Sequence, residues 1–336
     1  MRGLGAALAL ALTVGVAKAD VTVLNWSDLD GWTRDDLDLA RSVFLETCGD
    51  LDSEWDAACD GARAGGSARG FFESAFRPVL IKDGGEALFT GYYEPELRGS
   101  RQQGGDYQYP LHRLPDDVPR NEAWLTRKEI ETSGVLAGQS LEIVWLSDPV
   151  EKFFLQVQGS GRIRLEDGSV VRVGFGGRNG HKYRSVGREM IRLGIFKEHE
   201  ASAQRIKGWV RENPGKGLKM LWHNPSYIFF REITGLDESK GPLGAMNRPI
   251  TAERSIAVDP KIVPLGAPVW LEKDGALPLR KLMIAQDTGS AIKGAQRADI
   301  FFGSGDEAGE TAGRVRDTGR MIVLLPSAHA RALARN

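Results

Sequence analysis

Cysteine, histidine and long apolar runs are scarce in this chain of 336 residues. The chain has two cysteines, Cys48 and Cys59, and five histidines that show neither an HExxH pattern nor another paired spacing. This scarcity argues against the common zinc motifs, so we expect no metal and no cofactor. The longest apolar stretch near the N-terminus, residues 4–16, is too short to cross a membrane comfortably. We therefore expect no transmembrane segment.

An excess of one charge is also absent. The formal net charge is -1, and neither sign forms a long run. A chain without a basic patch or tail has little to attract a polyanion, so a nucleic-acid partner is not expected. The composition, 41% hydrophobic and 26% charged, is that of a globular protein, and the length favours about two domains.

The first 19 residues predict export from the cytoplasm. Arg2 precedes the short apolar run, which ends at Ala17-Lys18-Ala19, an arrangement typical of a signal peptide that is cleaved after Ala19. In an oxidising compartment Cys48 and Cys59 are expected to form one local disulfide. Neither cysteine lies at the cleavage site, where a lipid anchor would be attached. The predicted location is therefore the periplasm, without a lipid anchor.

The pattern of apolar residues predicts helices first and strands later. Apolar residues recur at helical spacing between residues 34 and 76, and a strand is expected at 87–93, followed by a polar crossing segment at 98–107. Beyond it we expect strands at 141–146 and 153–158, a hairpin at 163–173 and short helices at 185–194 and 203–212. After residue 245, five short apolar runs alternate with Gly, Pro and Asp, which is typical of a small β-barrel.

Two aspartates in this last region are the strongest candidates for chemistry. Asp287 ends one apolar strand and Asp299 begins the next, so both carboxylates are expected at one mouth of the barrel. Paired carboxylates are what acid/base cleavage of a glycosidic bond requires. Asp299 has apolar neighbours on both sides, which help it to keep its proton. Lys293, in the intervening loop, is expected to compensate the charge of Asp287. A loop held by Asx-turns at each aspartate is the structural alternative.

Other motifs allow two further interpretations. The run Asp287-Thr288-Gly289-Ser290 resembles the aspartic-protease signature, and a second Asp-Thr-Gly occurs at 317–319. The two copies are too close in sequence to belong to two protease lobes, and no apolar strand precedes the second. The glycine-rich segment 174–180 is not set between a strand and a helix, so we expect a loop and not a dinucleotide site.

Polar and aromatic side chains suited to a sugar are plentiful. Gln156 and Gln158 are expected on one face of a strand, followed by Gly159 and Ser160, and two amides on an apolar strand need partners. For the aromatic residues, stacking on a sugar ring competes with ordinary core packing. The candidates for stacking are Tyr92, Tyr93, Trp209, Trp222 and Tyr227.

Taken together, several ordered motifs resemble the MltA family of lytic murein transglycosylases. They cover most of residues 85–326, whereas the first 80 residues match poorly and Ser290 replaces a glycine that is common in the family. The matching stretches are 89–95 (FTGYYEP), 156–161 (QVQGSG), 186–188 (VGR), 224–230 (NPSYIFF), 254–260 (RSIAVDP), 262–266 (IVPLG), 285–289 (AQDTG) and 299–303 (DIFFG).

The resemblance implies a fold that is mainly β with α. A double-psi β-barrel with N-terminal helices would comprise residues 20–104 and 241–336, and a β-rich domain would be inserted at 105–240, with a groove between the two. The implied reaction cleaves the β-1,4 bond between N-acetylmuramic acid and N-acetylglucosamine and leaves a 1,6-anhydromuramic end. The implied partners are peptidoglycan strands and, further, proteins of cell-wall synthesis or division. Many relatives are outer-membrane lipoproteins, and this chain departs from them.

The same resemblance assigns roles to residues. Asp299 matches the catalytic aspartate and Asp287 the supporting one. The residues expected to bind substrate are Thr90, Gly91, Tyr92, Gln156, Gln158, Gly159, Ser160 and Lys293. Two other classes of protein remain compatible with these residues, namely a non-catalytic wall-binding protein and a glycoside hydrolase that releases reducing ends.

Overall fold

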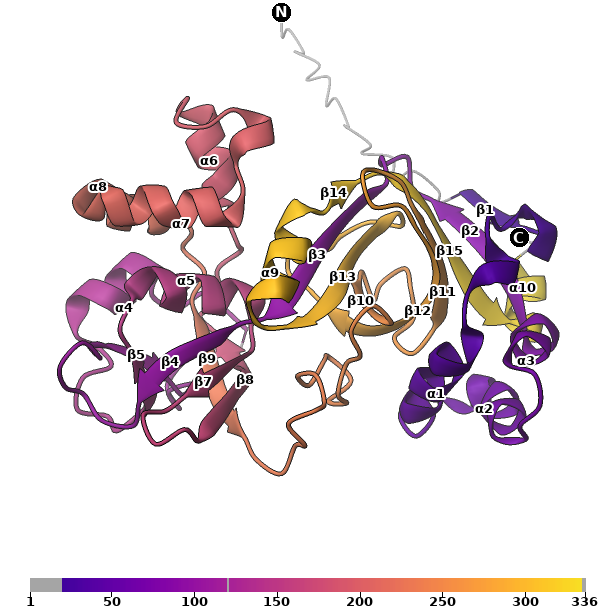
Figure 1. Ribbon diagram of the computed structural model, residues 1–336, viewed down its shortest axis with the longest axis horizontal. Coiled ribbons are helices and arrows are strands. Elements are labelled where there is room, and N and C mark those ends of the chain that lie inside the picture. The colour runs from indigo at the N-terminus through magenta and orange to yellow at the C-terminus, as the bar shows by residue number, and fades with distance from the viewer. Residues whose placement is uncertain (1–19, 120, 334–336) are drawn as a thin grey trace, which may run out of the picture.

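The protein consists of two sheets with helices around each, in line with the expected fold that is mainly β with α (Figure 1). The computed structural model describes residues 20–119 and 121–333. The expected signal peptide, residues 1–19, lies outside the described residues. Over the described ranges, no helix has the length and apolar character needed to cross a membrane.

The larger sheet has nine strands and is built from both ends of the chain. Its order is β1-β2-β15-β11-β12-β10-β13-β3-β14, and β10 with β12 and β13 with β3 are parallel pairs within an otherwise antiparallel sheet. The five apolar runs after residue 245 all become strands, as predicted. The strands are β1 Asp20–Val23, β2 Phe76–Lys82, β3 Leu88–Glu94, β10 Ser255–Val258, β11 Pro268–Lys273, β12 Leu279–Thr288, β13 Arg297–Ser304, β14 Arg316–Asp317 and β15 Gly319–Pro326.

Three N-terminal helices cover one side of this barrel, α1 Leu37–Thr47, α2 Asp56–Arg63 and α3 Ala68–Ala75, as the helical spacing predicted. The side chain of Asp36 accepts a hydrogen bond from the backbone of Asp38 and so caps α1. Phe44 and Phe71 pack against Phe76 of β2, which joins the helices to the barrel core. The expected disulfide between Cys48 and Cys59 is present and ties the end of α1 to α2. Two further helices flank the C-terminal strands, α9 Gly305–Arg314 and α10 Ser327–Leu333.

The smaller sheet has six strands in the order β5-β6-β4-β7-β8-β9. Its strands are β4 Glu96–Ser100, β5 Tyr109–His112, β6 Glu142–Leu146, β7 Gly161–Arg164, β8 Val170–Arg178 and β9 Ile228–Ile233, and the predicted hairpin is β7–β8. The helices of this part are α4 Arg127–Ser133, α5 Pro149–Gln158, α6 Val186–Arg192, α7 Ala203–Glu212 and α8 Pro214–Leu221. Because β4 belongs to this sheet, the chain leaves the barrel at Pro95, before the expected boundary at 104. The inserted part is also richer in helix than predicted.

The strand expected at residues 153–158 is wrong, because this segment is part of helix α5. Local signals at both ends explain the helix. The side chain of Asp148 accepts a hydrogen bond from the backbone of Val150 at 2.7 Å, and Pro149 occupies the first turn. Gly159 ends the helix at φ 83°. Residues two apart on a helix point in nearly opposite directions, so Gln156 and Gln158 do not share a face.

The loop expected at residues 174–180 is also wrong over most of its length, because β8 continues to Arg178. The glycines allow a neighbouring strand to approach closely. A Cβ atom on Gly176 would lie 2.6 Å from the backbone carbon of Phe230 in β9. Close backbone packing therefore explains this glycine-rich stretch.

A buried ion cluster lies where the two sheets meet. Glu94, the last residue of β3, has only 1% of its side chain exposed. Its carboxylate accepts hydrogen bonds from Arg162 of β7 at 2.7 Å, from Arg172 of β8 at 3.0 Å and from Ser304 at the end of β13 at 2.7 Å. Glu94 therefore binds residues of both sheets at the point where the chain passes between them.

Candidate functional site

The two aspartates singled out in the sequence flank one residue of strand β10. Ala257 pairs with Asp287 of β12 on one side and with Asp299 of β13 on the other. Both side chains are half-buried. The topology therefore brings the two carboxylates to one region of the barrel, as predicted.

One face of strand β3 contacts both carboxylates. Thr90 pairs with Asp299 in the parallel ladder, and its hydroxyl donates a hydrogen bond of 2.6 Å to the Asp299 carboxylate. Arg297 donates in turn to the Thr90 hydroxyl at 2.8 Å. Two residues further along β3, the Tyr92 hydroxyl donates to Asp287 at 2.8 Å. Thr90 and Tyr92 therefore both hold an aspartate, since alternate residues of a strand share a face.

The opposite face of β3 packs on helix α9. A Cβ atom on Gly91 would lie 2.8 Å from the Cα atom of Ala312, and one on Gly309 would lie 2.8 Å from the Tyr93 ring. Gly91 and Tyr93 therefore form the contact between β3 and helix α9.

Burial raises the pKa of both aspartates. For Asp287, removal from water raises the pKa to about 6, and the nearby charge of Asp299 adds to the effect. Hydrogen bonds from Tyr92 and from the backbone of Thr288 and Ala245 partly oppose it. For Asp299, burial also raises the pKa, against the opposing effects of Thr90 and Arg297. Each carboxyl is thus more easily protonated than an exposed aspartate.

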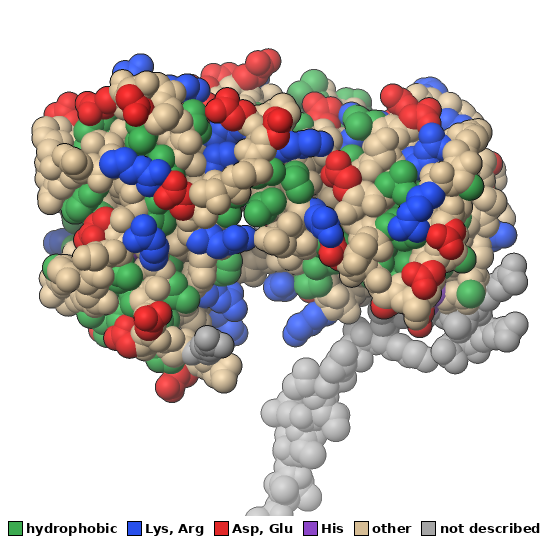
Figure 2. Space-filling view, turned by 90° about the horizontal axis from the view of Figure 1, so that it is seen from below, with side chains coloured by type: hydrophobic (Ala, Val, Ile, Leu, Met, Phe, Trp, Pro, Cys, Tyr) green, Lys and Arg blue, Asp and Glu red, His purple; other side chains and the backbone are tan. Residues whose placement is uncertain are grey.

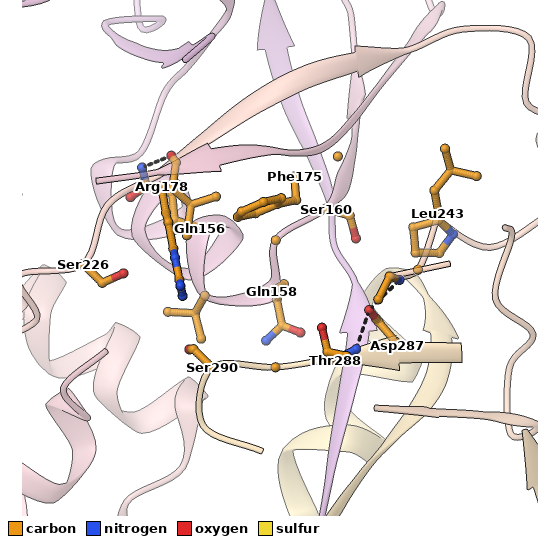
Figure 3. A pocket seen from close by; sticks show the side chains of 18 of the residues that line it. Gln156, Gln158, Ser160, Phe175, Arg178, Ser226, Leu243, Asp287, Thr288 and Ser290 are labelled. Carbon is orange, nitrogen blue, oxygen red and sulfur yellow. Dashed lines mark hydrogen bonds between the residues drawn. The ribbon is translucent and has the colours of Figure 1, made fainter. Parts of the chain in front are cut away.

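A groove of about 420 Å³ opens between the inserted part and the barrel (Figure 3). One wall comes from α5, β8 and β9, and the other from residues 242–247 and 287–290. Asp287 lies in this lining, whereas Asp299 lies outside it, across Ala257 from Asp287. In Figure 2 the molecule forms two lobes parted by a notch, with Lys and Arg side chains on both sides.

Apart from Lys293, the structure places the predicted binding residues in three groups. Gln156, Gln158, Gly159 and Ser160 line the groove (Figure 3). The amide of Gln156 is already engaged, because it accepts from Arg127 at 2.6 Å and donates to the backbone of Ile228 at 2.8 Å. Thr90 and Tyr92 bind the aspartates, and Gly91 packs on α9, as described above.

Lys293 does not compensate the charge of Asp287, and this prediction is wrong. Its ammonium group lies 3.7 Å from the carboxylate of Asp259, and 57% of the side chain is exposed. The loop between β12 and β13 carries Lys293 away from the groove because Asp259 also accepts a hydrogen bond from the backbone of Gly294.

The second Asp-Thr-Gly does not form a dyad with the first. Asp317, on β14, pairs with the ammonium group of Lys273 at 2.6 Å. This pairing removes the structural basis for the aspartic-protease interpretation.

The aromatic residues in the groove are Phe175 and Tyr183, which the sequence did not single out. Phe175 has 54% of its surface exposed, although it lies on β8 (Figure 3). By contrast, Tyr227 is only 1% exposed, and Trp222 donates a hydrogen bond to Glu131 outside the groove. The sequence also missed the arginines of the groove, Arg127, Arg178 and Arg231. Alternation along β8 gave no signal for Phe175, since the four residues before it, 171–174, are all buried.

Comparison with known proteins agrees with this architecture. Residues 88–231 match the model of the MltA specific insert domain, and residues 254–325 match that of the 3D domain. The chain is 33% identical over 291 residues to membrane-bound lytic murein transglycosylase A of Escherichia coli K12. The aligned region covers 82% of this chain and 76% of the relative.

Solved structures give the same result. A membrane-bound lytic murein transglycosylase from Agrobacterium tumefaciens is 32% identical, with a TM-score of 0.82, over 93% of this chain and 99% of that one. MltA of E. coli with bound chitohexaose is 28% identical, with a TM-score of 0.75, over 91% and 94% of the two chains. The 3D domain is of the double-psi barrel type, so the similarity includes the barrel that was expected.

Proposed function

Because the chain belongs to the MltA family of lytic murein transglycosylases, we propose that it cleaves peptidoglycan glycan strands with Asp299 as its acid and base. The observation that carries this assignment is the half-buried Asp299 carboxyl with a raised pKa, held by Thr90 beside a groove. The glycan strand would lie in that groove. The related structure of E. coli MltA, which contains bound chitohexaose, supports binding of a glycan chain.

One carboxyl group serves both steps of the proposed reaction. Protonated Asp299 donates its proton to the glycosidic oxygen as the bond between the two sugars breaks. Positive charge develops on the muramic acid ring, as in other glycosidic cleavages. The Asp299 carboxylate then takes the proton of the C6 hydroxyl, whose oxygen closes the 1,6-anhydro ring. No water is consumed, and an internal nucleophile is favoured over water because it is already held in place.

The neighbouring residues position these groups. Thr90 orients Asp299, and Tyr92 and the backbone of Ala245 fix Asp287, so Asp287 shapes the site and is not a nucleophile. The exposed ring of Phe175 offers an apolar face to a sugar, and the Gln158 side chain and Ser160 offer polar contacts.

Product analysis distinguishes this function from its rivals. Purified sacculi are digested, and the released muropeptides are identified by mass spectrometry. We expect anhydromuramic ends, which are lighter by one water than reducing ends. Reducing ends would indicate a hydrolase, and binding without release would indicate a wall-binding protein.

The pH dependence of turnover tests the role of Asp299 separately. The acid must be protonated before cleavage, so kcat/KM is expected to fall as pH rises through the raised pKa of Asp299. The Thr90→Val variant removes the donor that favours the carboxylate. The pKa of Asp299 should then rise, and the alkaline limb should move to higher pH in a pH–rate profile. A shift to lower pH, or no shift in a folded variant, would contradict the assignment.

The proposed location of the enzyme is the periplasm. This follows from the expected signal peptide and from the substrate, which lies outside the cytoplasm. A cell fractionation with a tagged full-length chain tests it.

A further inference from the structure

The groove carries an excess of positive charge, although the whole chain is close to neutral. Three arginines line it, Arg127, Arg178 and Arg231, and among the described lining residues Asp287 is the sole acidic one. Because the pKa of Asp287 is raised to about 6, its carboxylate takes up a proton more readily than that of an exposed aspartate. The charge imbalance is therefore a property of the site and not of the composition.

Two of the three arginines already donate hydrogen bonds to other residues of the protein. Arg127 is 1% exposed, and its guanidinium donates to Glu131, to Gln156 and to the backbone oxygens of Asn224 and Ser226. Arg231 is exposed and donates to the side chain of Asn247 at 2.8 Å and to the backbone oxygen of Phe175 at 3.4 Å, and no carboxylate of the described residues pairs with it.

The guanidinium of Arg178 differs from the other two, because it has no such partner among the described residues. Within residues 20–119 and 121–333, no hydrogen bond or ion pair engages its guanidinium, and the side chain is exposed. It extends from the end of β8 into the groove, on the side of Gln156, Ser226 and Ser290 and away from Asp287 (Figure 3). Asn179, the next residue, is fully buried and bonds to Leu125 and Pro225, which fixes the backbone beneath Arg178.

We propose that Arg178 binds a carboxylate carried by muramic acid, so that this end of the groove selects an anionic glycan over a neutral one. The inference rests on the proposed function and adds which chemical group of the glycan strand the site recognises. A guanidinium presents a planar pair of N–H donors that matches a carboxylate, and such charge-assisted bonds are among the strongest in proteins.

The carboxylate has two possible sources on the same sugar. In a strand that lacks peptides, the lactyl group ends in a free carboxylate. In a strand that carries stem peptides, the lactyl carboxyl is an amide, and the free carboxylates belong to the peptide. A chitin oligomer has neither, so it supplies a neutral probe of the same backbone.

Binding to the Asp299→Asn variant tests the proposal without turnover. Dissociation constants are measured by calorimetry for soluble muramic glycan strands with stem peptides, for the same strands after removal of the peptides, and for chitohexaose. Adding Arg178→Gln should weaken binding of at least one muramic strand by about tenfold, the effect expected for one charge-assisted bond. Binding of chitohexaose should stay unchanged. Arg178→Lys, which keeps the charge and loses the planar pair of donors, should retain part of the affinity.

The pattern of losses identifies the source and can also overturn the proposal. A loss confined to peptide-free strands assigns the lactyl carboxylate, and a loss confined to peptide-bearing strands assigns the peptide. An equal loss for chitohexaose, or no loss for either muramic strand, refutes the proposal. Arg98→Gln, an exposed arginine on β4 outside the groove lining, is the matched control for the change in net charge. Retained lytic activity in Asp299→Asn would defeat the catalytic assignment and leave the binding result standing.

Discussion

Replacing Asp299 by asparagine is expected to lower kcat on murein sacculi by about a thousandfold, because the variant has no proton to donate to the glycosidic oxygen. The amide still accepts the hydrogen bond from Thr90 through its oxygen, so the barrel should keep its fold. The amide also carries no charge, and burial of the Asp299 carboxylate is unfavourable, as its raised pKa indicates. Thermal unfolding should therefore occur at an equal or higher temperature at neutral pH.

The matched control for this variant is Asp306→Asn. Asp306 is an exposed aspartate in the first turn of α9, outside the groove lining. Its substitution changes the net charge equally and should leave kcat nearly unchanged. Release of anhydro products by folded Asp299→Asn at the wild-type rate would remove Asp299 from the mechanism.

Replacing Glu94 by glutamine is expected to lower the free energy of unfolding by about 3 kcal/mol, since it leaves one buried and one half-buried arginine without a counter-charge. The side chains of Arg162 and Arg172 are 16% and 6% exposed, so water cannot replace the lost carboxylate well. Urea unfolding at neutral pH measures the change. The activity should fall as well, because Glu94 joins the sheets that form the two walls of the groove.

Glu96→Gln provides the comparison, two residues along the chain. Glu96 pairs with Arg164, and both side chains are far more exposed, at 36% and 48%. An exposed pair contributes little, so the expected loss is below about 1 kcal/mol. Equal losses for the two variants would show that burial of the Glu94 cluster does not matter.

Much of the fold could be predicted from local patterns. Five of the six strands after residue 245 were found because each contains a short apolar run bounded by Gly, Pro or Asp, whereas the two-residue strand β14 has no such run. Helix α5 was missed because Phe153, Phe154 and Leu155 suit a buried strand and a buried helix equally well. The capping by Asp148 and Pro149 was visible in the sequence and would have favoured the helix.

The site was predictable only where chain order determines it. Asp287 and Asp299 were found because they lie near the end and near the start of consecutive strands, which both border β10. Arg178 and Phe175 were missed because they come from a different sheet, and their place in the groove depends on how the two sheets pack. Lys293 was misplaced because proximity in sequence does not determine the direction of a side chain in a loop.

Three side chains of strand β3 follow one another at alternate positions, Thr90, Tyr92 and Glu94, and they hold Asp299, Asp287 and the arginine cluster in turn. A slip of one residue in the register of β3 would turn all three to the side of α9 and bring Gly91 and Tyr93 inward. The contacts that hold Asp299, Asp287 and the arginine cluster would then all be lost together. A substitution at one of these positions therefore disturbs one of the three contacts, whereas an insertion or deletion of a single residue disturbs all three.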